Sequence, residues 1–497
     1  MRERAFSGDI DLAYALDLLQ RINNVVVDGV RLKDFTVLGG YNIWHSYQSN
    51  LLVGHCQSFS ETRGKTTQAA AGGRGEVYLA GVAALLGFFI SVLAIARASF
   101  LKVPVLVFTP DKLSDSSGQH DFRFDTIYQF LNSEHIPYSQ LLHTVFGKRL
   151  LRNVWKRRNF PIYLEALSVP YLIGRKLRLL KAPQKLSRTA DLGAFSEEEI
   201  PFVRATVNFY LAQIPRTLFR IRLLSWLFRR LSFRYILAID DIRYLFELTL
   251  AAKFAGVPVL AFQHGHVSKY HLGALRAELS GLIPYPDRFY VWSEYWKKEY
   301  LRLGSIFPEE TIEIGGVGKA RLPVPTKRSH GGPITILFPY ETAGPRQETR
   351  EYFDTILSCP NTRVFFKLRP DLSTSSQRQE YGIDRYESER FSVGVFGEKE
   401  LEDVDIVAGT YSTYLYHMIA YRKPIALIKT SSDFGEGLIK NSLADELDRR
   451  EPGLCEKIVR LANTSEATLK AREKKLLGEK DILLSDTLRR ILAPISK

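Results

Sequence analysis

A chain of 497 residues is about three times the length of a typical domain, which excludes a single small module and predicts two or three domains. Its 45% apolar and 25% charged residues exclude a disordered chain and a multi-span transporter. The formal net charge of +14 indicates an anionic partner, such as nucleic acid, a phosphate-bearing substrate or an anionic membrane surface.

The first long feature is an uncharged apolar run over residues 77–96. As a helix it is long enough to cross a hydrocarbon core of about 30 Å, but a helix buried on all sides has the same composition. Buried strands are predicted before it at 35–38 and after it at 103–108. If both belong to one sheet, the helix cannot place its ends on opposite sides of a bilayer. We therefore expect a shallowly inserted, monotopic helix, with a single span or a buried helix as alternatives.

Residues 148–234 contain 19 basic and five acidic residues, an excess equal to the whole net charge. Large apolar side chains, Trp155 and Trp226 among them, alternate with the basic ones. Such amphipathic helices are typical of proteins that bind an anionic leaflet. Solvated helices packed on a core are the alternative. Nucleic acid is not an expected partner, because no motif of a nucleic-acid-binding module is present.

The three cysteines, Cys56, Cys359 and Cys455, are far apart in the sequence. We therefore expect neither a disulfide framework nor structural zinc, and we assign the chain to a reducing cytoplasm. Asp403 and Asp405 have the spacing of a metal-binding pair, but they stand at the start of a predicted strand. No metal site is expected.

From residue 230 onward, short predicted strands alternate with helices, which is typical of a parallel α/β sheet. The first unit has its strands at 233–239, 257–262, 288–292 and 311–314, and the second at 334–339, 363–366, 404–408 and 425–428. The stretch 322–333 is rich in proline and polar residues and reads as a linker. The predicted domains are therefore 1–325 and 326–497.

Four strand exits, in this order, resemble the GT-B glycosyltransferases of bacterial surface polysaccharide synthesis. They are a His-Gly turn after VPVLAF, the Gly-rich IGGVG, Lys367-Leu368-Arg369-Pro370, and Gly-Thr-x-Ser-Thr followed by Lys-Pro. The resemblance covers about residues 233–430. The families that the chain resembles include the Kdo- and sialyltransferase-like enzymes of capsule and lipopolysaccharide synthesis. They also include the CDP-glycerol glycerophosphotransferases of teichoic acid synthesis.

The resemblance implies two Rossmann-like domains that face each other across a cleft. The first, with the apolar and basic helices, would bind the acceptor, and the second would bind the nucleotide-activated sugar. These families usually have Lys-x-His-Pro where this chain has Arg369. An arginine can hold a phosphate there, but it cannot transfer a proton at neutral pH.

The resemblance also suggests roles for individual residues. His264 is the expected general base, with Asp240 and Asp241 as rivals. The acceptor side is assigned to Gln263 and His266. Glu436 is expected to accept hydrogen bonds from the ribose hydroxyls of the donor. The residues expected to bind the nucleotide phosphates are Lys367, Arg369, Ser412 and Thr413, with Lys319 and Arg321 as further candidates.

The sequence thus predicts a membrane-associated glycosyltransferase at the cytoplasmic face of the cell membrane. Its donor substrate would be a nucleotide-activated sugar, its acceptor a lipid-linked sugar or surface glycan, and neither cofactor nor metal would be required. Two alternatives use the same scaffold: a non-catalytic export or assembly factor, and a nucleotide-sugar epimerase. A nucleic-acid-binding protein is the least favoured interpretation.

Overall fold

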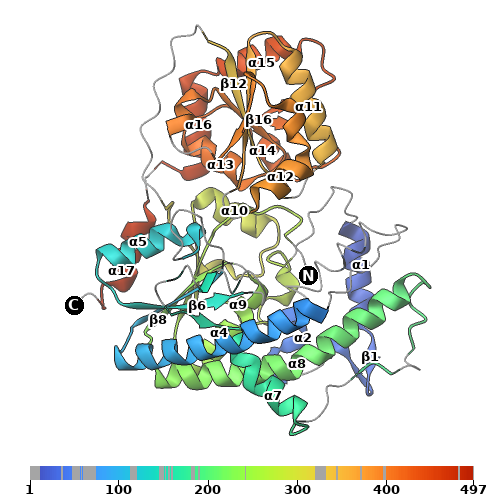
Figure 1. Cartoon of the computed structure of the whole chain (residues 1–497), viewed down its shortest axis with the longest axis vertical. Helices are drawn as coiled ribbons and strands as arrows, with labels where there is room; N and C mark the ends of the chain where they lie inside the picture. The colour runs from blue at the N-terminus through green and yellow to red at the C-terminus, as the bar shows by residue number, and fades with distance from the viewer. Residues whose placement is uncertain are drawn as a thin grey trace.

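Two α/β domains, each built on a parallel sheet, lie one above the other along the long axis of the molecule (Figure 1). The computed structural model describes residues 12–34, 37–47, 56, 59, 74–111, 120–144, 150, 153–154, 157, 160–180, 185–187, 191–240, 242–271, 273–318, 332–342, 345–369, 372–395, 399–479 and 482–495. The fold class predicted from the sequence, with two Rossmann-like sheets, is confirmed.

The first sheet has seven strands in the order β11-β10-β9-β8-β5-β6-β7, and all neighbours are parallel. Its strands are β5 (Val105–Pro110), β6 (Tyr138–His143), β7 (Ile162–Tyr163), β8 (Tyr235–Ile239), β9 (Val259–Phe262), β10 (Arg288–Val291) and β11 (Ile312–Ile314). The chain starts at the central β5, winds outward to β7, then restarts beside β5 with β8. This is the doubly wound order, in which ligands bind beyond the carboxyl ends of the strands at the reversal point, here between β5 and β8.

The second sheet repeats this order with six parallel strands, β14-β13-β12-β15-β16-β17. They are β12 (Ile334–Pro339), β13 (Thr362–Lys367), β14 (Phe391–Gly394), β15 (Ile406–Gly409), β16 (Ile425–Ile428) and β17 (Asp445–Leu447). Its reversal point lies between β12 and β15.

Helices cover the sheets, whose strands β5, β9 and β15 are buried throughout, as is β8 beyond its first residue. The first domain has α5 (Asp125–Ser133), α7 (Val169–Lys176), α8 (Glu199–Arg230), α9 (Ile242–Ala255) and α10 (Glu294–Arg302). The second has α11 (Arg346–Ser358), α12 (Thr374–Tyr381), α13 (Thr413–Ala420), α14 (Glu436–Lys440), α15 (Leu454–Ala462) and α16 (Glu466–Leu477). The helices are apolar toward the sheets, as the near-continuous apolar strands of a parallel sheet require.

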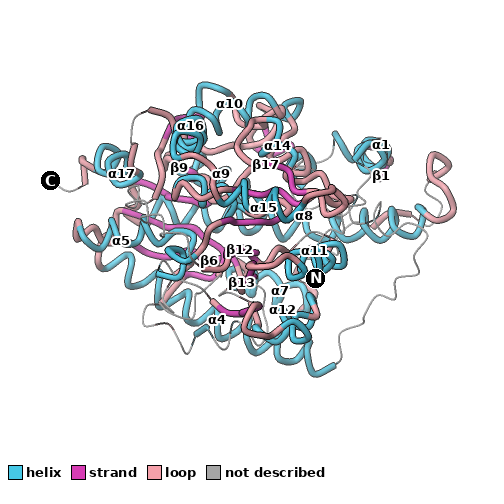
Figure 2. Tube along the Cα trace, turned by 90° about the horizontal axis from the view of Figure 1, so that it is seen from above, coloured by secondary structure: helices cyan, strands magenta, loops and turns pink. Residues whose placement is uncertain are grey.

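The predicted apolar run forms the middle of α4 (Arg74–Phe100), which packs beside the edge strand β7. Within α4, Ala80–Phe100 is long and apolar enough to cross a membrane. Only 28% of its most apolar 18-residue stretch is buried inside the protein. Figure 2 shows α4 at the outer margin of the molecule.

The N-terminal segment forms α1 (Leu12–Asn23), α2 (Ile43–Tyr47) and two small hairpins, β1 (Val26–Val27) with β2 (Val30–Arg31) and β3 (Val37–Leu38) with β4 (Tyr41–Asn42). The strand predicted at 35–38 is thus not part of the main sheet. Val37 and Leu38 are followed by Gly39 and Gly40, both at positive φ, which turn the chain back at once.

All nine strands predicted from residue 103 onward appear, with ends shifted by at most two residues, whereas β6, β7, β14 and β17 were not predicted. The expected linker at 322–333 falls mostly outside the described residues. Within the basic block, α7 and α8 are helical as expected.

One expectation about the cysteines is wrong. Cys359 follows α11, Cys455 lies in α15, and the two sulfur atoms form a disulfide across a sequence separation of 96 residues. The third thiol, Cys56, is buried and free, and burial raises its pKa to about 12.

The last helix, α17 (Leu484–Leu492), follows the second domain in the chain but packs against α5 of the first. Leu488 and Leu492 are buried in one cluster with Phe130 and Leu131, and Figure 1 shows the two helices side by side. The chain therefore passes between the two domains twice.

Candidate active site

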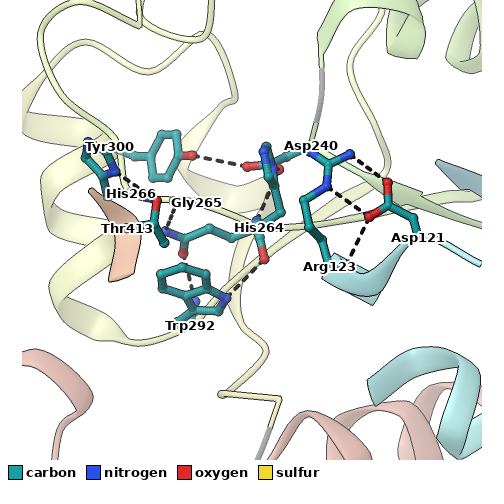
Figure 3. A network of polar contacts seen from close by, with 10 residues as sticks. Asp121, Arg123, Asp240, His264, Gly265, His266, Trp292, Tyr300 and Thr413 are labelled. Atoms are coloured by element: carbon teal, nitrogen blue, oxygen red, sulfur yellow. Dashed lines mark hydrogen bonds and ion pairs between the residues drawn. The ribbon is translucent and has the colours of Figure 1, made fainter. Parts of the chain in front are cut away.

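Side chains with polar groups in the first domain follow neighbouring strands on one side of the reversal point of its sheet. Asp240 follows β8, Gln263 and His264 follow β9, and Trp292 follows β10. Because parallel strands end at the same edge, these side chains meet at the carboxyl edge of the sheet, as Figure 3 shows.

His264 and Asp240 form a pair rather than acting as rivals for one role. The Nδ1 atom of His264 is hydrogen-bonded to Oδ1 of Asp240, which also accepts the His264 backbone N–H at 3.2 Å. Asp240 is almost buried, whereas 30% of the His264 side chain is exposed. The carboxylate therefore favours the tautomer with its proton on Nδ1, and it leaves Nε2 as the basic nitrogen.

Tyr300, from α10, supports the same carboxylate. Its hydroxyl donates to Oδ2 of Asp240 at 3.4 Å (Figure 3). Burial and the nearby negative charge of Asp240 raise the pKa of Tyr300 well above its usual value, so the hydroxyl stays protonated and remains a donor.

Gln263 is buried and braces the turn that carries His264. Its side-chain NH₂ donates to the carbonyl of Gly265 at 2.8 Å, and its side-chain oxygen accepts the backbone N–H of Trp292 at 3.0 Å. The indole N–H of Trp292 donates to the Gln263 carbonyl at 3.0 Å. These contacts fix the loop; direct contact of Gln263 with an acceptor stays a prediction.

His266 links the two domains. Its Nδ1 lies 3.0 Å from the hydroxyl oxygen of Thr413, the first residue of α13, and its backbone N–H lies 3.3 Å from the same oxygen. The imidazole stacks on Tyr416 with ring centroids 5.4 Å apart. The carboxyl ends of the two sheets therefore face each other here.

Burial lowers the pKa of His266 well below its usual value, so the ring is neutral in the folded protein. An unfolded histidine binds a proton near pH 6.5. Below that pH the unfolded state therefore binds one more proton, and stability should fall by up to about 1.4 kcal/mol per pH unit. We expect His266→Gln to reduce the pH slope in urea unfolding between about pH 7.5 and 5.5 by the share of one proton, while His271 and His417, whose pKa values desolvation also lowers, keep theirs. The exposed His135, changed to Asn, should leave the slope intact; an unchanged slope in His266→Gln would contradict the assignment.

The turn after β15, predicted to hold a phosphate, surrounds a buried carboxylate of the protein. The backbone N–H groups of Thr410, Tyr411 and Ser412 donate to Glu341 over 2.8 to 3.0 Å, and the Thr410 hydroxyl donates to it as well. Glu341 follows β12, so it occupies the reversal point of the second sheet. Burial raises the pKa of this carboxyl, while these donors oppose that effect.

The other members of the predicted phosphate site lie around this turn. The Ser412 hydroxyl accepts the Tyr414 N–H at 3.2 Å and caps α13. Lys367 ends β13, with its ammonium 5.4 Å from the centre of the Tyr414 ring. Arg369 is half-buried, and Gln377 holds its backbone N–H and carbonyl at 2.8 and 2.9 Å. Lys367 and Arg369 remain the predicted phosphate ligands.

Glu436 begins α14 and lies at a second contact between the domains. It is 3.5 Å from the ammonium of Lys269 in the first domain and 2.9 Å from that of Lys440. Lys269 and the Tyr270 hydroxyl are also bonded to Asp433. A contact of Glu436 with ribose stays a prediction. Asp241, Lys319 and Arg321 lie outside the described residues.

Two ion pairs in this region were not predicted. Asp121 is fully buried and accepts hydrogen bonds from Nε and Nη2 of Arg123 at 3.0 and 2.7 Å. Both residues are drawn in Figure 3. His143, the last residue of β6, pairs with the buried Glu165, which follows β7. No sequence motif marks either pair. In the described part of the chain, no three His, Cys, Asp or Glu side chains are grouped to hold a metal ion.

No family model and no curated protein matches the chain. Among solved structures, it is similar to the calicheamicin glycosyltransferase CalG4, with 11% identity over 79% of this chain and 98% of that one and a TM-score of 0.47. It is also similar to MurG of Acinetobacter baumannii, with 12% identity over 79% and 99% and a TM-score of 0.44. The UDP-GlcNAc 2-epimerase of Methanocaldococcus jannaschii has 10% identity over 79% and 99% and a TM-score of 0.44. These likenesses concern the fold alone.

Proposed function

We propose that the protein is a membrane-associated glycosyltransferase that moves a sugar, or a similar group, from a nucleotide-activated donor to a lipid-linked or surface-glycan acceptor. The observation that carries the proposal is the His264–Asp240 pair at the carboxyl edge of the first sheet, beside its reversal point. The His266–Thr413 contact places this edge opposite the reversal point of the second sheet. The resemblance to Kdo- and sialyltransferase-like and CDP-glycerol families supports the same chemistry.

In the proposed reaction, the acceptor hydroxyl gives its proton to Nε2 of His264 while its oxygen bonds to the reacting carbon of the donor. The bond between that carbon and the donor phosphate breaks, and the nucleotide leaves with the electron pair. Asp240 stabilises the imidazolium that forms. Lys367 and Arg369 stabilise the charge that develops on the phosphate.

The acceptor class and the location belong to the same proposal. The first domain carries exposed apolar and basic helices, which suits an acceptor held by a lipid at the surface of the membrane. We propose a metal-independent reaction, because Lys367 and Arg369 supply the positive charge that a metal would otherwise provide.

A thermal-shift screen with CMP, CDP, UDP and GDP tests the donor class. We expect one nucleotide to stabilise the protein, by about 2.7 kcal/mol at a hundred times its dissociation constant. Stabilisation by none would contradict the proposal and favour the export or assembly factor. With the matching nucleotide sugar, conversion of the donor to its epimer without any acceptor would instead assign the epimerase.

Changing Arg369 to alanine is expected to weaken binding of that nucleotide about 10- to 100-fold, because a charge-assisted hydrogen bond contributes about 1.5 to 3 kcal/mol. Isothermal titration measures the effect. The exposed Arg385 of the same domain, changed to alanine, is the matched control and should bind as the wild type does. If both variants bind the nucleotide with the same affinity, Arg369 is not a ligand of the nucleotide phosphates.

A further inference from the structure

The outward face of α4 is apolar and uncovered. Phe89 is 63% exposed and Leu93 55%, while Gly87 and Ser91 on the opposite face are buried. The exposed set recurs at helical spacing and is Val82, Leu85, Phe89, Val92, Leu93, Ala96 and Phe100. The buried set is Ala83, Gly87, Ile90, Ser91, Ala94 and Ala98. The helix thus has one apolar face packed on the protein and a second one that the protein leaves open.

The packed face holds α4 flat along the edge of the first sheet. The Ser91 hydroxyl accepts the backbone N–H of Tyr163, on the edge strand β7, at 2.8 Å and donates to the Gly87 carbonyl at 2.6 Å. At Gly87 the helix backbone packs against Ala166 and Tyr163, and an added Cβ would lie in van der Waals contact with both. A helix that spanned a bilayer would have to break these contacts.

Next to α4, the end of α7 adds exposed apolar and basic side chains. The chain folds back after Arg178, which has a φ of 57°, and the Leu179 N–H donates to the Gly174 carbonyl at 2.9 Å. The exposed apolar residues there are Leu172, Ile173, Leu177, Leu179 and Leu180. The exposed basic residues are Arg175, Lys176 and Arg178 on this segment and Arg97 and Lys102 at the end of α4. None of these five forms an ion pair with any residue that the structure describes.

We propose that this α4–α7 face docks on the surface of an anionic bilayer, with α4 lying in the plane of the interface. The apolar side chains enter the boundary of the acyl chains, and the five cations lie at the level of the lipid phosphates. A second copy of the chain fits less well, because a symmetric contact would bring the same unpaired cations together. The purpose of the surface, access to a lipid-linked acceptor, rests on the proposed function, but the binding is measured without donor or acceptor.

Flotation with preformed vesicles tests the binding. We expect the wild type to float with vesicles of equal parts phosphatidylglycerol and phosphatidylcholine, and far less with phosphatidylcholine alone. Phe89→Glu with Leu93→Glu should abolish flotation, and Arg175→Gln, Lys176→Gln and Arg178→Gln together should reduce partitioning about a hundredfold. The control, Val395→Glu with Val459→Glu, changes two exposed apolar residues of the second domain and should float like the wild type.

The orientation of α4 has its own measurement. Phe89 lies near the middle of α4, so it would reach the bilayer centre if the helix spanned the membrane. A fluorophore on Phe89→Cys should be quenched most by bromines near the headgroup end of the lipid chains. Strongest quenching by bromines at the chain ends would overturn the in-plane orientation.

Three further results would overturn the docking surface. The first is equal flotation of the wild type on both vesicle types, and the second is flotation of the Phe89/Leu93 variant to the same extent as the wild type. The third is a wild type that does not float but sediments as a dimer, together with a Phe89/Leu93 variant that sediments as a monomer. Nucleotide-induced stabilisation, which the variant should retain, shows that it is folded. Flotation without any response to a nucleotide would leave the surface standing and reject the transferase instead.

Discussion

Replacing His264 with alanine is expected to lower the rate of transfer about 10²- to 10⁴-fold, the usual contribution of a general base. The imidazole is held by Asp240, which is itself held by Tyr300, so its Nε2 has a fixed position at the edge of the first sheet. The nucleotide is assigned to the other domain, so its affinity should not change. Steady-state kinetics and a nucleotide titration on the same preparation separate the two effects.

The companion variant Asp240→Asn tests whether Asp240 positions the imidazole. An amide can donate to Nδ1 and so favours the wrong tautomer, which should lower kcat while the KM for the donor stays unchanged. Changing His135, an exposed histidine of the same domain, to asparagine should affect neither value. Full activity of His264→Ala would end its assignment as the base.

Replacing Glu341 with alanine is expected to destabilise the second domain by about 3 to 5 kcal/mol, the largest loss of stability expected for a single change in this site. The substitution leaves three backbone N–H groups and the Thr410 hydroxyl facing a space with no acceptor. Urea unfolding measures the loss. Glu341→Gln keeps one oxygen in the turn and should cost less than the alanine variant.

The alanine variant also opens a site for an anion. Converging N–H groups before a helix bind sulfate or phosphate, because the helix dipole adds to the hydrogen bonds. Inorganic phosphate should therefore restore stability to Glu341→Ala and have little effect on the wild type. If phosphate stabilises both equally, the anion binds elsewhere, and Glu341 does not fill this turn in solution.

The strands around the site could be predicted from sequence because each is a short apolar run that ends at a polar turn. Runs such as VPVLAF and ITILFP fix both the element and the edge where its polar residues lie. His264, Lys367 and Thr413 were identified for that reason.

Pairings across the fold could not be predicted. Asp240 and His264 are 24 residues apart, and the sequence presents them as competitors because nothing in it gives the direction of their side chains. Glu341 stands one residue beyond a strand among polar residues, so its burial appears only when β15 is placed beside β12. The disulfide was not predicted for the same reason. Cys359 and Cys455 are 96 residues apart in the sequence, whereas their Cα atoms are 5.5 Å apart in the fold.

The apolar run shows another limit of the sequence. Both faces of α4 are apolar, so the sequence has no periodicity that separates the packed face from the open one. The expected in-plane helix rested on a strand at 35–38 that turned out to be part of a hairpin. The in-plane orientation of α4 is supported instead by the hydrogen bond between Ser91 and β7.

Residues 316–317 and 482–484, which flank the two passages of the chain between the domains, lie side by side. Val317 donates to the Ile482 carbonyl at 3.2 Å, and Leu484 donates back to Val317 at 2.9 Å. Gly316, with a φ of 82°, lies so close that a Cβ would be 2.2 Å from the Ile482 oxygen. The two segments are thus joined by backbone hydrogen bonds, with no room for a side chain at residue 316. Any separation of the two domains must break the His266–Thr413 and Lys269–Asp433 contacts, which also join them.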